Sequence, residues 1–238
     1  MHPDWLALLE EDAYAIVPHV IGRAEVERLL HALDAAGGAE GARRRESVYA
    51  IRNLLDAVPE VRALAESPAV RALVEPVLGA SAFPVRGILF DKTPDANWKV
   101  AWHQDLAIAV RERRETPGFG PWSEKAGVTH VQPPAAVLER MLTVRVHLDD
   151  CGLENGPVHV VPGSHRHGRL DADATACWRE SAAPVPTCTG AGGALLMRPL
   201  LLHASSPSTT PAHRRVVHIE YAVDDLPGGL EWHDRRRA

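Results

Sequence analysis

From residue 83 onward the chain is a succession of short apolar or alternating segments separated by proline, glycine and aspartate. The clearest segments have the length and pattern of β-strands, and they cover residues 85–90, 141–148, 158–161, 194–197 and 216–223. No helical pattern separates them, which favours an antiparallel sandwich or barrel over a parallel α/β sheet. We therefore predict a mainly β jelly roll, preceded by helices in an α+β arrangement.

The first third of the chain has a helical pattern instead. Apolar residues recur at three- and four-residue steps over residues 26–33, which predicts a helix that ends at Gly37-Gly38. A second helical pattern covers residues 59–78 and is interrupted near Pro68, because proline cannot continue a helix without disturbing it. Gly79 is a plausible stop signal for this second stretch.

These patterns predict one domain in two parts. Residues 1–80 are expected to form a mainly helical layer, and residues 81–238 a jelly-roll core. Residues 111–134 are rich in glycine, proline and charge, and are long for a simple connection. Loops of that length are usually functional or disordered, so we predict a lid there.

Composition excludes several classes of partner. The formal net charge is -5, so no broad basic field exists to hold nucleic acid or an anionic membrane surface. No long uncharged apolar run predicts a membrane span or an export signal. Three cysteines without metal-binding spacing suit reduced thiols, and hence a cytoplasmic protein. The oligomeric state is not readable from the sequence.

A metal site is predicted from three residues. In the sequence His103-Gln104-Asp105, the first and third side chains project from the same face if the segment is a strand. His203, which ends an apolar strand-like run, is the candidate third ligand. Two histidines and one carboxylate form the facial triad of non-haem Fe(II) oxygenases, which leaves coordination positions open for chemistry.

The metal-site prediction is strengthened by two polar residues that follow His203 in the sequence. Ser205 follows His203 by two positions, and Arg214 lies on the next predicted strand. An arginine there can bind a carboxylate through two charged hydrogen bonds, and a hydroxyl can complete the site. The distal carboxylate of 2-oxoglutarate requires this combination of groups.

At this point the sequence resembles the phytanoyl-CoA dioxygenase-like family of Fe(II)- and 2-oxoglutarate-dependent oxygenases. The resemblance spans most of the chain and rests on Trp102-His-Gln-Asp, Leu148-Asp-Asp, Glu154-Asn-Gly-Pro, Val161-Pro-Gly-Ser-His and His203-x-Ser with Arg214 downstream. It implies a cupin-like double-stranded β-helix. It also implies that His103, Asp105 and His203 hold iron, and that Ser205 and Arg214 hold 2-oxoglutarate, with O2 as the oxidant. Relatives that halogenate lack the carboxylate ligand, so the presence of Asp105 disfavours halogenation.

Further contacts are predicted less directly. Alternation puts Thr143, Arg145 and His147 on one face of their strand, which is the candidate cavity face. We expect Thr143 and Lys92 to contact the co-substrate. Arg145 is expected to bind an anionic group of the substrate or to help orient 2-oxoglutarate, and the alternative is an arginine on the outer face paired with an acid. Other candidate contacts are Asn97 and Trp122 for the co-substrate, and His130, Gln132 and Trp122 for the substrate.

Several conspicuous residues have simpler interpretations. Trp102 and Gln104 point away from the ligands in a regular strand, and we expect Trp102 to be a core residue. His165 and His167 lie at a predicted turn and are interpreted as structural or exposed. Three further histidines have no second potential ligand at a spacing typical of a metal site, and we treat them as non-ligands: His213, His218 and His233.

The expected reaction is hydroxylation of an unactivated C–H bond of a small molecule, with release of succinate and CO2. An anionic substrate is suggested by four basic residues near the predicted cavity, namely Arg86, Lys92, Arg145 and Arg198. Two alternatives remain open. One is a zinc-dependent hydrolase using the same three ligands, and the other is a non-catalytic jelly-roll binding protein.

Overall fold

The computed structural model describes residues 4–37, 42–44 and 48–235. Its largest sheet is antiparallel, with strands in the order β1 (Tyr14–Val17), β12 (Ala194–Met197), β9 (Met141–His147), β14 (Arg214–Ala222), β4 (Phe83–Lys92), β3 (Val48–Ile51) and β2 (Ala42–Arg44). A second sheet contains β11 (Val185–Pro186), β10 (Val158–Val160), β13 (His203–Ser205) and β5 (Val100–His103). A third, smaller sheet contains β6 (Ile108–Val110), β8 (Val128–Val131) and β7 (Trp122–Lys125).

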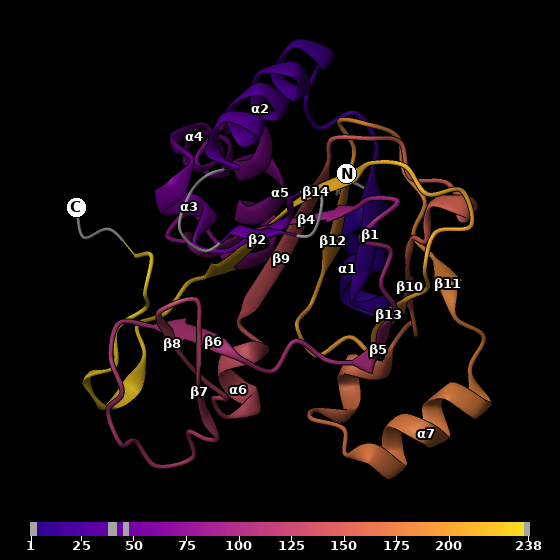
Figure 1. The fold of residues 1–238 in the computed structure, drawn as a ribbon. Helices are drawn as coiled ribbons and strands as arrows, with labels where there is room; N and C mark the ends of the chain where they lie inside the picture. The colour runs from indigo at the N-terminus through magenta and orange to yellow at the C-terminus, as the bar shows by residue number, and fades with distance from the viewer. Residues whose placement is uncertain (1–3, 38–41, 45–47, 236–238) are drawn as a thin grey trace.

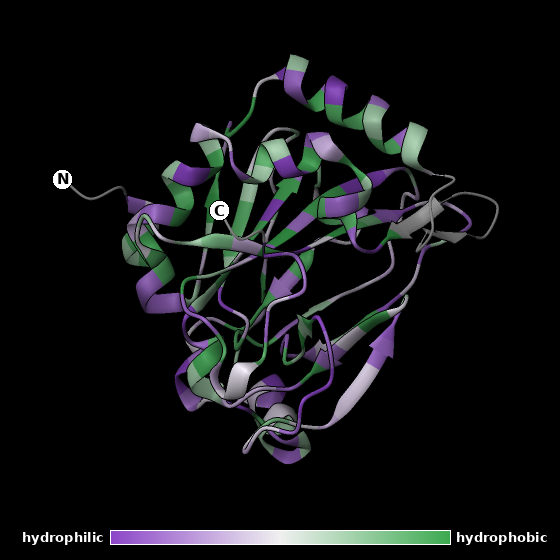
Figure 2. Ribbon diagram, turned by 90° about the vertical axis from the view of Figure 1, so that its left-hand side faces the viewer, coloured by the Kyte–Doolittle hydropathy of each residue, from purple (hydrophilic) through white to green (hydrophobic). Residues whose placement is uncertain are grey.

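Most helices belong to the N-terminal third. They are α1 (Asp4–Asp12), α2 (Arg23–Ala36), α3 (Leu54–Ala57), α4 (Pro59–Ala65) and α5 (Pro68–Leu78), and two more follow later in the chain, α6 (Ala135–Leu138) and α7 (Ala172–Ser181). Helices α2 to α5 lie together on one side of the seven-stranded sheet (Figure 1). Figure 2 shows α2, the long helix at the top, striped with hydrophilic and hydrophobic residues, as expected for a helix with one buried face.

Side chains of β14 alternate between the two faces of the main sheet, one packed against the helices and the other facing the four-stranded sheet. Val217, Ile219 and Tyr221 are buried in the core that the sheet forms with the helices. The hydroxyl of Tyr221 donates a hydrogen bond to the carbonyl of Ala65 at the end of α4, at 3.0 Å. The intervening residues of β14 lie on the other face, which is turned toward the four-stranded sheet.

The two larger sheets face each other around a smaller apolar core. Leu195 and Met197 of β12 pack there with Val158 and Val160 of β10. This is the predicted jelly roll, and the five predicted strands correspond to β4, β9, β10, β12 and β14. The predicted helices correspond to α2, α4 and α5, and the interruption near Pro68 is the break between α4 and α5. Gly38 lies outside the described residues.

The N-terminal third is less purely helical than predicted. Strand β1 pairs with β12 along its whole length, and β3 pairs with β4, so this region extends the main sheet at both edges. The sequence Tyr14–Val17 is only four residues long, and its strand state depends on the edge of β12 that it covers. A local pattern could not reveal that partner.

The segment predicted as a lid loop, residues 111–134, contains regular structure, while its role as a lid stays a prediction. It contains β7 and β8, which form a hairpin through Ala126 and Gly127, both with positive φ as type I′ turns require. Phe119 and Val131 of this region are buried in an apolar cluster that also contains Trp232 and Val85 of the main sheet. Among the described residues, no helix combines the length and apolar character needed to cross a membrane.

Helix α3 packs very closely on the main sheet. A Cβ built on Gly87 of β4 would lie 2.9 Å from Leu55 Cγ and 3.1 Å from the Leu55 backbone nitrogen. We expect Gly87→Ala to lower the free energy of unfolding by about 1–3 kcal/mol, since the added methyl forces helix and sheet apart. Urea unfolding measures this loss. The control is Gly190→Ala, whose Cβ meets Asp150 Oδ1 at an ordinary 3.4 Å, and equal losses in both variants would contradict this account.

Candidate metal centre

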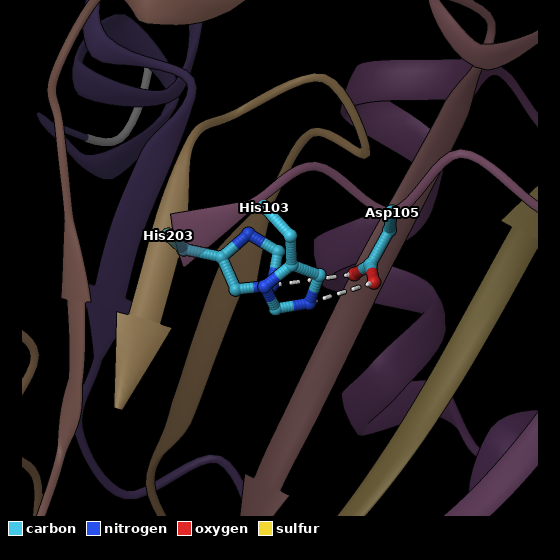
Figure 3. A group of neighbouring side chains, drawn as sticks. All are labelled: His103, Asp105 and His203. Atoms are coloured by element: carbon cyan, nitrogen blue, oxygen red, sulfur yellow. Dashed lines mark ion pairs between the residues drawn. The ribbon is translucent and has the colours of Figure 1, made fainter. Parts of the chain in front are cut away.

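Strand pairing brings the two predicted histidine ligands together. His103 at the end of β5 and His203 at the start of β13 are direct partners in the antiparallel register. Asp105 lies just beyond β5, where its backbone N–H donates to the carbonyl of Pro199 at 2.9 Å. The three side chains converge on one point (Figure 3), and their potential ligand atoms all lie within 4.8 Å of one another.

Both imidazoles are oriented for metal binding by a hydrogen bond to a backbone carbonyl. Nδ1 of His103 is 2.8 Å from the carbonyl of Ala101, and Nδ1 of His203 is 2.8 Å from the carbonyl of Leu201. A carbonyl can only accept, so each Nδ1 carries a proton, and Nε2 is the ring nitrogen left to bind a metal. Hydrogen bonds from Nδ1 to a backbone carbonyl fix metal-binding histidines in many proteins. Each Nε2 atom lies 3.7 Å from one carboxylate oxygen of Asp105.

Electrostatics favour the protonation states that a metal requires. Burial lowers the pKa of His203 to about 4, so its ring is neutral at pH 7. Burial would raise the pKa of Asp105, but the nearby His203, His218 and His103 hold it well below its usual value. Oδ2 of Asp105 is buried and has no hydrogen-bond partner within the described parts of the chain. A neutral imidazole beside a carboxylate oxygen that has no hydrogen-bond partner fits a divalent cation.

Gln104, between the two ligands, has a positioning role. Its Nε2 donates to the carbonyls of Leu200 at 2.6 Å and Gly168 at 2.8 Å, and its Oε1 accepts from the N–H of Leu170 at 2.8 Å. It therefore ties the His103 segment to the segment that leads into His203. Trp102, predicted to be core, is only partly buried and lines a separate hollow of about 290 Å³.

The centre opens into a cavity of about 160 Å³ between the sheets. Six residues predicted from the sequence line it, namely His103, Asp105, Arg145, His203, Ser205 and Arg214. The other lining residues are Phe90, Trp98, Val100, Val158 and His218, which sequence reasoning missed. Phe90 and His218 had a detectable signal, because alternation from Lys92 along β4 and from Arg214 along β14 places them on the cavity face.

One end of the cavity concentrates positive charge. Lys92 and Arg214 are direct partners across β4 and β14, and both are buried. Nζ of Lys92 donates to Ser205 Oγ at 3.3 Å and to the carbonyl of Ser206. Burial and the neighbouring Arg214 lower the pKa of Lys92 to about 8. Arg214 donates one bond to the carbonyl of Gly156, while its Nε is buried without a partner in the described structure.

A second buried guanidinium lies on β9. Nη1 of Arg145 contacts His218 Nδ1 at 2.8 Å, and Nε2 of His218 contacts Glu220 Oε1 at 3.1 Å. Glu220 in turn forms an ion pair with Arg86. Burial and the neighbouring Arg214 lower the pKa of Arg145 to about 10, and its Nε has no hydrogen-bond partner among the residues described. The cavity thus contains two arginines that lack a facing anion.

Gly156, in the Asn-Gly-Pro turn, shapes the positive end of the cavity. Its φ is +64°, and a Cβ there would lie 2.4 Å from the Ser206 carbonyl and 3.0 Å from Lys92 Nζ. The family resemblance implies that 2-oxoglutarate binds at this end, so we expect Gly156→Ala to displace both groups and raise the half-saturating concentration of 2-oxoglutarate about 10-fold, a loss of ~1.4 kcal/mol. Succinate release measured against co-substrate concentration tests this.

The control separates backbone strain from crowding. Gly163→Ala has a similar positive φ of +74° but no atom within 4 Å of its Cβ. It is expected to lower stability without altering the co-substrate dependence. Equal co-substrate defects in the two variants would exclude crowding as the cause.

Five predicted contacts lie outside the cavity lining, and one of them, Lys92, reaches it only through Ser205. Thr143 is buried in β9 opposite Glu220. Trp122 packs against the core of the three-stranded sheet, with the Arg113 guanidinium 5.6 Å from its ring centroid. His130 is buried in β8, and its Nδ1 bonds to the Val128 carbonyl at 2.9 Å. Gln132 accepts a hydrogen bond from Arg169.

Other candidates have structural partners. The Asn97 side chain donates to the Ser208 carbonyl at 2.8 Å and accepts from its N–H at 2.6 Å. Arg198 lines another hollow, with Glu139 and His165, and donates to the Met141 carbonyl at 3.2 Å. Neither residue lines the cavity of the His/Asp/His centre.

Two facing antiparallel sheets with a His/Asp/His centre between them define a class of protein, the jelly-roll oxygenases of the non-haem iron type. The family model for phytanoyl-CoA dioxygenase (PhyH) matches residues 9–216, and the chain belongs to that family. It is a 2-oxoglutarate-dependent oxygenase that uses Fe(II) and O2. The resemblance noted from the sequence motifs is therefore confirmed.

Individual relatives agree with this classification. The chain is 25% identical to an L-proline trans-4-hydroxylase of Streptomyces griseoviridis, over 88% of this chain and 82% of the relative. The crystal structure of the carbocyclase SnoK from nogalamycin biosynthesis has a similar fold, with a TM-score of 0.73 at 19% identity, over 94% of this chain and 85% of SnoK. The epimerase SnoN, crystallised with Fe3+, α-ketoglutarate and nogalamycin RO, gives 0.69 at 21% identity, over 94% and 90%.

Proposed function

We propose that this oxygenase hydroxylates an unactivated C–H bond of a small anionic metabolite. In the overall reaction, one oxygen atom enters the substrate as a hydroxyl, and the other enters the succinate formed when 2-oxoglutarate loses CO2. The iron and O2 supply the oxidising chemistry, and the protein positions the substrate carbon and excludes water. His103, Asp105 and His203 are the proposed ligands.

The observation that carries this proposal is the pair of buried arginines in one cavity. A buried guanidinium without a facing anion is costly, because burial removes water without replacing it. Arg214 lies beside Ser205 and Lys92, so we assign the distal carboxylate of 2-oxoglutarate to this end. Arg145 comes from a different strand and is held by His218, so we assign it to an acidic group of the substrate.

The alternatives explain less of the cavity. A zinc hydrolase using the same centre has no use for two unneutralised arginines, and a non-catalytic jelly roll has no use for the oriented Nε2 atoms. The relative named for L-proline supports a small carboxylic acid as substrate. Contacts of Thr143, His130, Gln132 and Trp122 with a ligand stay predictions, and three free cysteines support a reducing, cytoplasmic location.

The test compares substrates in matched variants of Arg145. Succinate release is measured with a panel of small carboxylic acids and their neutral amides, using wild type, Arg145→Ala and Arg145→Lys. We expect a preference for acids in wild type, its loss in the alanine variant and its partial return in the lysine variant. A preference unchanged by Arg145→Ala would remove this residue from substrate binding.

A second measurement separates the two carboxylate sites. The dissociation constant of 2-oxoglutarate is measured anaerobically in the Arg145 variants with Fe(II) present. We expect little change, because the co-substrate is assigned to Arg214. A large increase would instead place Arg145 in the co-substrate site and leave the anionic substrate without support.

A further inference from the structure

A second cluster of potential metal ligands lies away from the cavity. It contains Asp56 of α3 together with His233 and Asp234, which follow β14 near the C-terminus. Their ligand atoms lie within 4.8 Å of one another, as in the His/Asp/His centre, and no other group in residues 4–37, 42–44 and 48–235 meets this condition. His233 Nε2 is 3.8 Å from Asp234 Oδ1, nearly the spacing between His203 and Asp105 of 3.7 Å.

Asp234 is the unusual member of this cluster. Its side chain is only 1% exposed, and Oδ1 has no hydrogen-bond partner in the described part of the protein. A buried carboxylate oxygen that meets a second carboxylate and an imidazole, but no donor, is an environment that a cation would stabilise.

The nearby arginines do not fill this role. Arg62 Nη2 forms an ion pair with Asp56 Oδ1 at 2.8 Å, and its Nε donates to the Leu55 carbonyl at 3.1 Å. Arg86 is paired with Glu220. Arg62 therefore orients Asp56, and Asp234 Oδ1 still lacks a donor.

Both halves of the cluster are held by the fold. The segment carrying His233 and Asp234 lies along β6, because the His233 N–H donates to the Ala109 carbonyl at 3.2 Å and Trp232 forms a bridge with Val110. Asp56 follows Leu55, which contacts Gly87 of the main sheet. The ligand positions are thus fixed by two separate packing contacts before any ion binds.

We propose that Asp56, His233 and Asp234 bind a second divalent transition-metal ion, which ties the C-terminal segment to α3. One imidazole and two carboxylates suit Zn2+ and related first-row ions better than a sulfur-seeking ion. His233 is about a quarter exposed and Asp56 is more than half exposed, which leaves an entry route and room for a water ligand. The sequence reading treated His233 as a non-ligand, because its partner Asp56 is far away along the chain.

The test removes the iron ligands first, so that only the second site remains. Untagged His103→Ala/His203→Ala protein is freed of metal, dialysed against micromolar ZnCl2 and analysed for bound zinc by mass spectrometry. We expect about one zinc per chain, and a rise in melting temperature of about 5 °C at a hundred times the dissociation constant. Adding His233→Ala should remove both effects, whereas His31→Ala, an exposed histidine of α2, should remove neither.

The zinc content of the variants decides whether the second metal site exists. No zinc in the double variant, or zinc that survives His233→Ala, would overturn the proposal. If His233→Ala fails to fold, Asp56→Asn replaces it, since that side chain is largely exposed and the change keeps its shape. Zinc bound at one equivalent and lost with Asp56→Asn supports the site. Because the iron ligands are absent in every variant, this result does not depend on the proposed hydroxylase activity.

Discussion

His203→Ala is expected to abolish Fe(II) binding at the His/Asp/His centre and to lower succinate release more than 100-fold. Removing a residue that only hydrogen-bonds to a metal ligand already lowers metal affinity or activity about 10–100-fold. Removing the ligand itself should therefore cost more. His203 is buried, and its Nδ1 is fixed by the Leu201 carbonyl. The alanine side chain has no atom that can coordinate the metal in place of the imidazole.

Binding is measured anaerobically, by adding Fe(II) and 2-oxoglutarate and following the weak visible charge-transfer band. The matched control is His159→Ala, a histidine of the neighbouring strand β10 that lines a different hollow. We expect the band in wild type and in His159→Ala, and none in His203→Ala. A full band in His203→Ala would contradict the ligand assignment, and no band in wild type would favour the hydrolase or binding-protein alternatives.

Arg214→Ala is expected to raise the dissociation constant of 2-oxoglutarate about 100-fold, because removing one member of a buried charge pair typically costs 2–5 kcal/mol (roughly 3 kcal/mol here). The Fe(II) ligands are untouched, so metal binding alone should be close to wild type. Arg214→Lys keeps the charge but loses the planar pair of donors, and an intermediate constant is expected.

The neighbouring residue provides the control for Arg214. Arg215 lies on the opposite face of β14 and pairs with Asp149 at 2.7 Å, so Arg215→Ala should leave the 2-oxoglutarate constant unchanged. Titration of the charge-transfer band gives the constants directly. Equal constants in Arg214→Ala and wild type would show that the co-substrate carboxylate lies elsewhere, with Arg145 as the next candidate.

Much of this site was predictable from the sequence because its signals are local. The short spacings from His103 to Asp105 and from His203 to Ser205 can be read from the sequence, although β5 ends at His103 and the register shifts between His203 and Ser205. Alternation likewise placed Arg145 on the cavity face of β9, where it does line the cavity. Five strand segments were detected because each alternates or is continuously apolar over its own length.

The missed features all depend on partners that are distant along the chain. Strand β1 exists because β12 offers it an edge, and β7 and β8 form a packed hairpin where composition indicated a loop. Trp122 and His130 lie outside the cavity lining because that small sheet turns them toward its own contacts, and Gln132 lies outside it with Arg169 as its partner.

The sequence by itself therefore determined the class of fold and the family, and it predicted which residues form the metal and carboxylate sites. Tertiary structure decided which charges are neutralised. Arg86 is paired with Glu220 across the sheet, whereas Arg145 and Arg214 are left facing a cavity, and Asp56 meets His233 and Asp234 only through packing. The physical reason is that short-range patterns fix where a side chain points along its own strand or helix, while its partners are set by the contacts between elements.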